Sequence, residues 1–165
     1  MIKYLLSPCL IVLNFNLSAN ELENSESLIL RSYSESLAEL ENSEEQCEKQ
    51  ATVLPKNLFS GINLSKKEME AVLLYKQHET FIHCTMAERY KYFMSASLLR
   101  AKKPKSAKMV DASNNINSYY FLRLLETEVE YKKIEQSKRD KIDKLEPLKS
   151  PFDLMSSLDV IVNEP

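Results

Sequence analysis

The sequence predicts an all-α fold: a bundle of three long helices plus a short C-terminal helix, held by one internal disulfide. Only one glycine, Gly61, occurs among the 165 residues, where average composition would give about 7 %. Turns that need positive φ angles are therefore rare. Apolar residues recur at the three- and four-residue spacing of amphipathic helices, in long segments separated by prolines. Both observations favour helices over strands.

Residues 1–19 have the layout of a secretory signal peptide. Lys3 gives a positive start, Tyr4 to Leu17 is mostly apolar, and Ala19 is a small residue suited to cleavage. As a retained anchor, the run is too short to span a bilayer comfortably. Cys9 loosely resembles a lipoprotein cysteine, but Pro8 stands where a small residue is needed. We expect a single mature domain of residues 20–165 that is periplasmic or secreted.

The first helix is predicted from about Glu21 to Thr52, and it is strongly acidic. Residues 20–53 carry nine acidic and two basic side chains, whereas residues 54–104 carry four acidic and nine basic ones. We therefore expect the first helix to lie against a more basic second helix. The chain as a whole has a net charge of −2, so nucleic acid is not expected as a partner.

The second helix is predicted to start at a capping box, Ser65 to Glu68, and to run to about Lys103. Pro55 ends the first helix, so residues 54–64 form a connector. Two apolar stripes run along the second helix, which is typical of a central helix packed on both sides. One stripe is Met69, Leu73, Thr80, Ala87, Tyr90, Met94 and Leu98; the other is Ala71, Leu74, Phe81, Cys84, Tyr92 and Leu99.

The third helix is predicted to start at Ser106 or Ser113 and to run to Glu146, where Pro147 stops it. A short helix follows, with Ser150 as its N-cap and Pro151 in its first turn. Its apolar stripe is Phe152, Met155, Leu158, Ile161 and Val162. Such a short helix is marginal alone in water, so we expect it to pack on the bundle rather than on a partner.

The two cysteines of the mature chain, Cys47 and Cys84, are predicted to form the disulfide, because exported proteins meet an oxidising compartment. Free thiols or a bridge between chains are the alternatives. Cys47 precedes the connector by about seven residues and Cys84 follows it by about twenty, which places them at different heights in a tight hairpin. An internal bridge therefore requires the connector to travel roughly 20 Å back along the second helix. Its apolar residues would pack along the way: Leu54, Leu58, Phe59, Ile62 and Leu64.

Aromatic residues flank the turn at Pro104 at matching distances, which predicts that they meet across the second and third helices. Most of this clustering is expected to be core packing, and the remaining tyrosines are candidates for a binding surface. Lysines gather at the same turn. The candidate surface comprises Tyr90, Tyr92, Tyr119, Tyr120, Lys102, Lys103 and Lys105. The lysines could also steer the protein to an anionic partner, but a membrane surface is not the expected one.

Catalytic chemistry has little support in the sequence. His78 and His83 are five residues apart, so they diverge on a helix, and neither stands in a nucleophile motif. Glu79, His83 and Met86 share a helix face, which motivates a metal- or stress-responsive protein as the alternative function. The leading prediction is an exported, non-enzymatic protein without a cofactor that binds another protein, as immunity proteins, inhibitors and secretion adaptors do.

Overall fold

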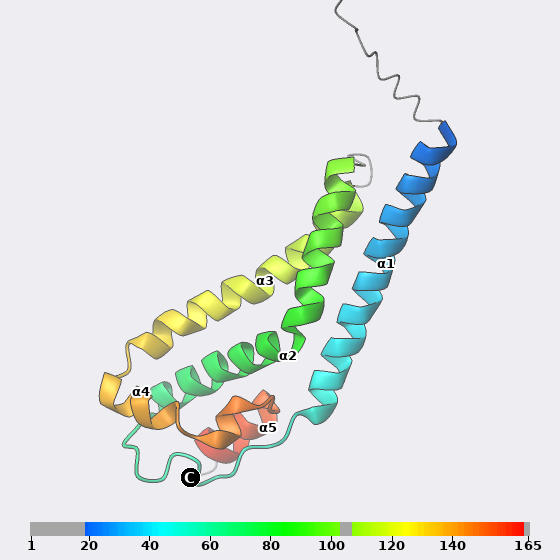
Figure 1. The fold of residues 1–165 in the computed structure, drawn as a ribbon. Coiled ribbons are helices and arrows are strands. Elements are labelled where there is room, and N and C mark those ends of the chain that lie inside the picture. The colour runs from blue at the N-terminus through cyan, green and yellow to red at the C-terminus, as the bar shows by residue number, and fades with distance from the viewer. Residues whose placement is uncertain (1–18, 103–106, 164–165) are drawn as a thin grey trace, which may run out of the picture.

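The computed structural model describes residues 19–102 and 107–163, and these are mostly helical (Figure 1). Three long helices come first: α1 (Ala19–Gln50), α2 (Lys66–Lys102) and α3 (Ala107–Lys132). Short elements follow: α4 (Gln136–Ile142), the 3-10 helix η2 (Glu146–Lys149), α5 (Leu154–Leu158) and the π-helical turn η3 (Asp159–Asn163). The described residues include no strand, only an isolated bridge between Thr52 and Phe152. The all-α prediction is confirmed, while nearly all of the predicted signal peptide lies outside the described residues.

α2 is central, as its two apolar stripes predict, and contacts both α1 and α3. Acidic side chains of α1 meet basic side chains of α2: Lys91 Nζ lies 3.0 Å from Glu39 Oε2, and Arg89 pairs with Glu44. Between the helices Tyr92 is fully buried against Tyr33, with ring centroids 5.7 Å apart. The predicted contact between an acidic and a basic helix is therefore confirmed.

The capping box at the start of α2 forms as predicted. The backbone N–H of Glu68 donates to Ser65 Oγ at 3.3 Å, and the backbone N–H of Ser65 donates to Glu68 Oε2 at 2.7 Å. The hydrogen bond from the Ser65 backbone and another from Lys138 lower the pKa of Glu68 from 4.5 to about 2. This carboxylate thus joins the start of α2 to α4.

α2 bends in its middle, so that its two halves point in different directions (Figure 1). Two threonine hydroxyls bond to carbonyls of the preceding turn: Thr80 Oγ1 donates to Lys76 O at 2.9 Å, and Thr85 Oγ1 donates to Phe81 O at 3.0 Å. Such bonds compete with the backbone ladder and often bend helices. We attribute the bend to these two residues, because α2 contains neither proline nor glycine.

The bend explains why α3 is shorter than the sequence predicts. The α2–α3 pair is joined by two aromatic contacts, Phe93 with Phe121 (centroids 5.9 Å apart) and Tyr75 with Tyr131 (4.6 Å). Between these contacts α2 has 18 residues, about 27 Å of helix, and α3 has only 10, about 15 Å. α3 therefore takes a shorter path between the two halves of α2, and it meets the first half after fewer residues than α2 has between the same contacts.

The predicted continuation of the third helix to Glu146 is consequently wrong. α3 ends at Lys132, and a turn leads into α4. This turn allows Ile134 and Ile142 to be buried together, at 4 % and 0 % exposure, in the cluster formed with the first half of α2. If α3 had continued as a straight helix, it would have carried Ile142 beyond Tyr75, where α3 already meets the first half of α2, and away from this cluster.

The connector packs along α2 as the disulfide geometry requires. Leu54, Leu58 and Phe59 are buried in one cluster with Val72 and Leu73 of α2, and Ile62 and Leu64 pack against it. Gly61 has a φ of 85°, a conformation that other residues rarely adopt.

The C-terminal segment is docked on the bundle, as predicted. Phe152 is 3 % exposed in the same cluster, and Leu54 N–H donates to Ser157 Oγ at 3.1 Å. Two details of the prediction are wrong. The N-cap of α5 is Asp153 instead of Ser150, because extended residues 150–152 pair with Thr52 before the helix begins. Met155 is 70 % exposed, because the helix packs on the bundle through Leu154 and Leu158 instead.

Candidate functional site

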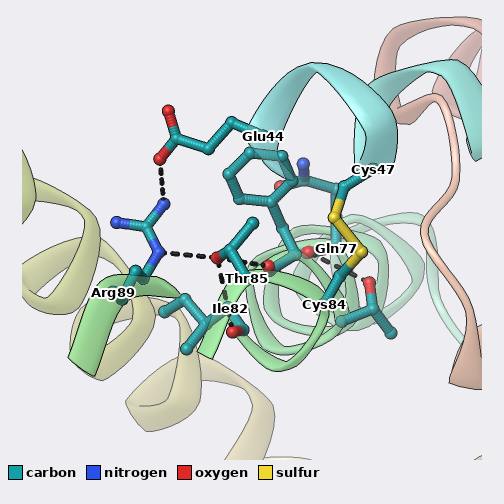
Figure 2. Close-up of a disulfide and its surroundings, with 9 residues drawn as sticks. Glu44, Cys47, Gln77, Ile82, Cys84, Thr85 and Arg89 are labelled. Atoms are coloured by element: carbon teal, nitrogen blue, oxygen red, sulfur yellow. Dashed lines mark hydrogen bonds and ion pairs between the residues drawn. A yellow bond between two sulfur atoms is a disulfide. The ribbon is translucent and has the colours of Figure 1, made fainter. Parts of the chain in front are cut away.

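The disulfide between Cys47 and Cys84 fastens α1 to α2, and its predicted pairing is confirmed (Figure 2). The two Cα atoms are 6.2 Å apart, within the usual range for a bridge. One turn further along α2, the guanidinium of Arg89 is 1 % exposed. It donates through Nε to Thr85 Oγ1 at 2.7 Å and through Nη2 to Glu44 (Figure 2). Burial raises the pKa of Glu44, although Arg89 opposes the shift.

The candidate surface of tyrosines and lysines is only partly brought together. Tyr90 and Tyr119 are exposed at 65 % and 53 %, and Lys102 is exposed as well. Tyr92 has no exposed surface, so its place on an interaction surface was a wrong prediction. It faces α1, where Tyr33 covers it. The structure does not describe Lys103 and Lys105, nor the side chain of Tyr120.

A different set of exposed apolar side chains is more extensive, and it includes Tyr90. On α2 a row recurs every four residues, and on α3 a second row recurs at steps of three and four. All seven side chains keep 45–65 % of their surface exposed. We call them the apolar face: Met86, Tyr90, Met94 and Leu98 of α2, with Leu122, Leu125 and Val129 of α3.

Both rows lie on the same side of the α2–α3 hairpin. Phe93 and Phe121 meet in the seam between the helices, and the next residues, Met94 and Leu122, are each turned forward by about 100°. Because the helices run in opposite directions, a forward turn on either one leads to the same side. Tyr92, one residue back from the seam, faces α1. α1 thus covers one side of the hairpin and the apolar face occupies the other.

Several charged residues adjacent in sequence to the apolar face form ion pairs. Arg123 Nη1 lies 3.2 Å from Glu126 Oε2 on α3, and Lys91 of α2 reaches Glu39 on α1. Arg123 also donates to Tyr119 Oη at 2.8 Å, with its guanidinium over the Tyr119 ring. An apolar centre with a polar margin is the usual composition of a protein interface.

Periodicity in the sequence finds this row on α2 but misassigns it. Tyr90, Met94 and Leu98 belong to the stripe that begins with Met69 and Leu73, and the stripe was predicted to be buried throughout. Leu73 is indeed fully buried, since the first half of α2 meets the connector and the C-terminal segment. Beyond the bend, the same stripe is left uncovered. The row on α3 was not predicted from the sequence.

A second enclosed charged cluster surrounds Lys76, which is 8 % exposed. Its Nζ lies 2.8 Å from both Glu79 Oε2 and Asp143 Oδ1, beside the rings of Tyr75 and Tyr131. Burial opposes the charge, but bonds to the two carboxylates outweigh it and raise the pKa of Lys76. Tyr75 Oη donates to Glu79 and Tyr131 Oη donates to Asp143, so each of these groups has a partner. The cluster joins α2, α3 and the end of α4.

The side chains that motivate a metal-responsive function do not form a set of metal ligands in this geometry. Glu79, its carboxylate candidate, bonds to Lys76 and Tyr75. His83 and Met86 are exposed. His78 bonds through Nδ1 to the carbonyl of Leu74 at 2.7 Å. Over the part of the chain that the structure describes, no three His, Cys, Asp or Glu side chains are grouped to hold a metal ion.

A cavity of about 350 Å³ lies beside Cys47, bounded by the end of α1, the middle of α2 and the C-terminal segment. Phe81, Phe152 and Leu154 form apolar parts of its wall. Among its polar groups, His78 bonds to the backbone of α2 and Asp153 caps α5 by accepting from the backbone N–H of Ser156. These two groups are therefore committed to holding the fold.

Among helices in residues 19–102 and 107–163, none has a stretch apolar and long enough to cross a bilayer. Comparison with protein-family models, curated proteins and solved structures finds no match for this chain.

Proposed function

We propose that this protein is an exported, non-enzymatic helical protein that acts by binding another protein through the apolar face. Immunity proteins, enzyme inhibitors and secretion adaptors act in this way. The apolar face carries the proposal, because monomeric proteins rarely expose contiguous apolar patches larger than a few hundred Å², and the largest patch on a protein surface is often its interaction site. Tyrosine and methionine are enriched at interfaces, and the face contains Met86, Tyr90 and Met94.

Export is supported by two features that do not depend on the face. The N-terminal sequence has the order of a signal peptide, from Lys3 through the apolar run to Ala19. The disulfide between Cys47 and Cys84 suits an oxidising compartment. The surroundings of Lys76 and Arg89 support a non-enzymatic role, because the carboxylates and hydroxyls there are engaged in bonds that join helices.

Affinity capture from the exported fraction of the source organism tests the proposal. Three forms of residues 20–165 serve as bait: the natural sequence, the double variant Met94→Lys with Leu125→Lys, and Leu28→Lys. Leu28 is 61 % exposed on α1, outside the apolar face, and is the matched control. We expect one protein to be captured in equal amounts by the natural sequence and the control, and to be lost with the double variant. Equal recovery with all three baits would contradict the proposal.

Calorimetric titration with zinc and with copper tests the metal-responsive alternative. The binding proposal expects no stoichiometric uptake of either ion. Stoichiometric uptake that His83→Gln abolishes would favour the alternative instead.

A further inference from the structure

We infer that, in the free protein, a second copy of the chain covers the apolar face and forms a symmetric dimer. The inference rests on the proposed function, because it takes the face as a protein-binding surface and names what occupies it. A target protein would then replace the second copy at this face. The inference is carried by the layering of the helices, the size of the face and its lack of charge.

The layering leaves the second half of α2 and most of α3 with one covered side. α1 and α3 both pack on α2. Among the described side chains of α3, only Tyr131 at its end is buried. Helical domains reach stability by packing two layers around a core. A second copy placed face to face supplies the missing layer, with α2 and α3 of each copy forming a four-helix contact.

The size of the face matches what a stable dimer needs. A standard interface buries about 800 Å² on each partner, of which roughly 60 %, about 480 Å², is apolar. Seven side chains that are 45–65 % exposed present roughly 300–550 Å² of apolar surface, on the scale that assigns about 60–120 Å² to a whole aliphatic side chain and about 150–250 Å² to tyrosine. The face alone therefore supplies the apolar part of one interface.

The composition of the face suits a symmetric contact. In a two-fold dimer the same patch meets itself, so an unbalanced charge within it would meet its own like charge. Neither row contains a charged residue, and the neighbouring Arg123 and Glu126 neutralise each other. A partner recognised by charge would instead require an unbalanced patch.

Light scattering coupled to size-exclusion chromatography, with oxidised residues 20–165 at about 100 μM, measures the mass directly. This concentration exceeds the micromolar upper end of the range in which interfaces of standard size bind. We expect the mass of two chains for the natural sequence and for Leu28→Lys. The dissociation constant is obtained by repeating the measurement over a dilution series. Met94→Lys and Leu125→Lys should each raise it by about 100-fold or more, because the symmetric contact buries two copies of the charge.

Circular dichroism at 222 nm shows whether the variants remain helical, which is expected since both positions are exposed on the surface of a single chain. A single-chain mass for the natural sequence would overturn the dimer. The proposed function would survive that result if capture of another protein still required the face. An unchanged dissociation constant in both face variants would also refute the inference, since it would place the contact elsewhere.

Discussion

Replacing Phe152 by alanine tests whether the C-terminal segment holds the core together. The phenyl ring is 3 % exposed in the cluster that includes Leu54, Leu73 and Ile142. Removing a buried aromatic side chain costs the lost burial plus the energy of the cavity left behind, typically about 3–5 kcal/mol. A domain of this size is stable by about 5–15 kcal/mol. We therefore expect the melting temperature to fall by roughly 10 °C or more.

Thermal unfolding followed at 222 nm, with the disulfide intact, measures this shift. Met155→Ala is the matched control, because Met155 lies three residues further along and is 70 % exposed; its effect should stay within about 0.5 kcal/mol. Truncation after Leu148 should destabilise the protein at least as strongly as Phe152→Ala. If Phe152→Ala and Met155→Ala melt at the same temperature, the segment is not docked in solution and our account of the core is wrong.

Three further predictions concern other parts of the chain. Glu68 has a pKa of about 2 in the folded protein, so it adds stability above pH 4.5 that is lost as pH falls from 4.5 to 2. Urea unfolding at several pH values should therefore show the stability difference between the wild type and Glu68→Gln shrinking over that interval. A constant difference would refute this role of Glu68. Arg89→Met should lower the free energy of unfolding in urea by about 3 kcal/mol, because it leaves the Glu44 carboxylate without its partner. A loss below about 1 kcal/mol would contradict this. Intact mass of the exported protein should show cleavage near Ala19 and the loss of two hydrogens to one disulfide; a mass that retains Met1 would exclude cleavage.

Local signals in the sequence predict much of this fold. The capping box of Ser65 and Glu68 involves four consecutive residues, so its geometry follows from helix formation alone. The pairing of Cys47 with Cys84 follows from the number of cysteines left in the mature chain, and it correctly implies a connector that packs along α2. Proline and capping residues also place the start of α2 and the existence of a C-terminal helix close to where they are found.

Two of the errors, the end of α3 and the burial of Met94, share a cause that periodicity does not contain. A bend changes the direction of a helix while leaving its hydrogen-bonded period almost unchanged, so the stripe through Leu73 and Met94 looks continuous in the sequence although its two halves meet different surroundings. The early end of α3 at Lys132 and the exposure of Met94 both follow from the bend at Thr80 and Thr85. Each threonine alone is an ordinary helical residue, and only the tertiary structure shows their joint effect.

The contact between residues 52–54 and the C-terminal segment sets the order in which the chain can fold. Leu54 N–H and Ser157 Oγ are separated by 103 residues, and closing a loop of that length costs roughly 4 kcal/mol of chain entropy. Synthesis starts at the N-terminus, so the residues of α1 and α2, with both cysteines, are made long before this contact is possible. The cluster that contains Leu54 and Phe152 therefore stays open until residues 152–157 have been made. A chain interrupted before Phe152 leaves this cluster uncovered, and exposed apolar surface of that kind invites proteolysis and aggregation.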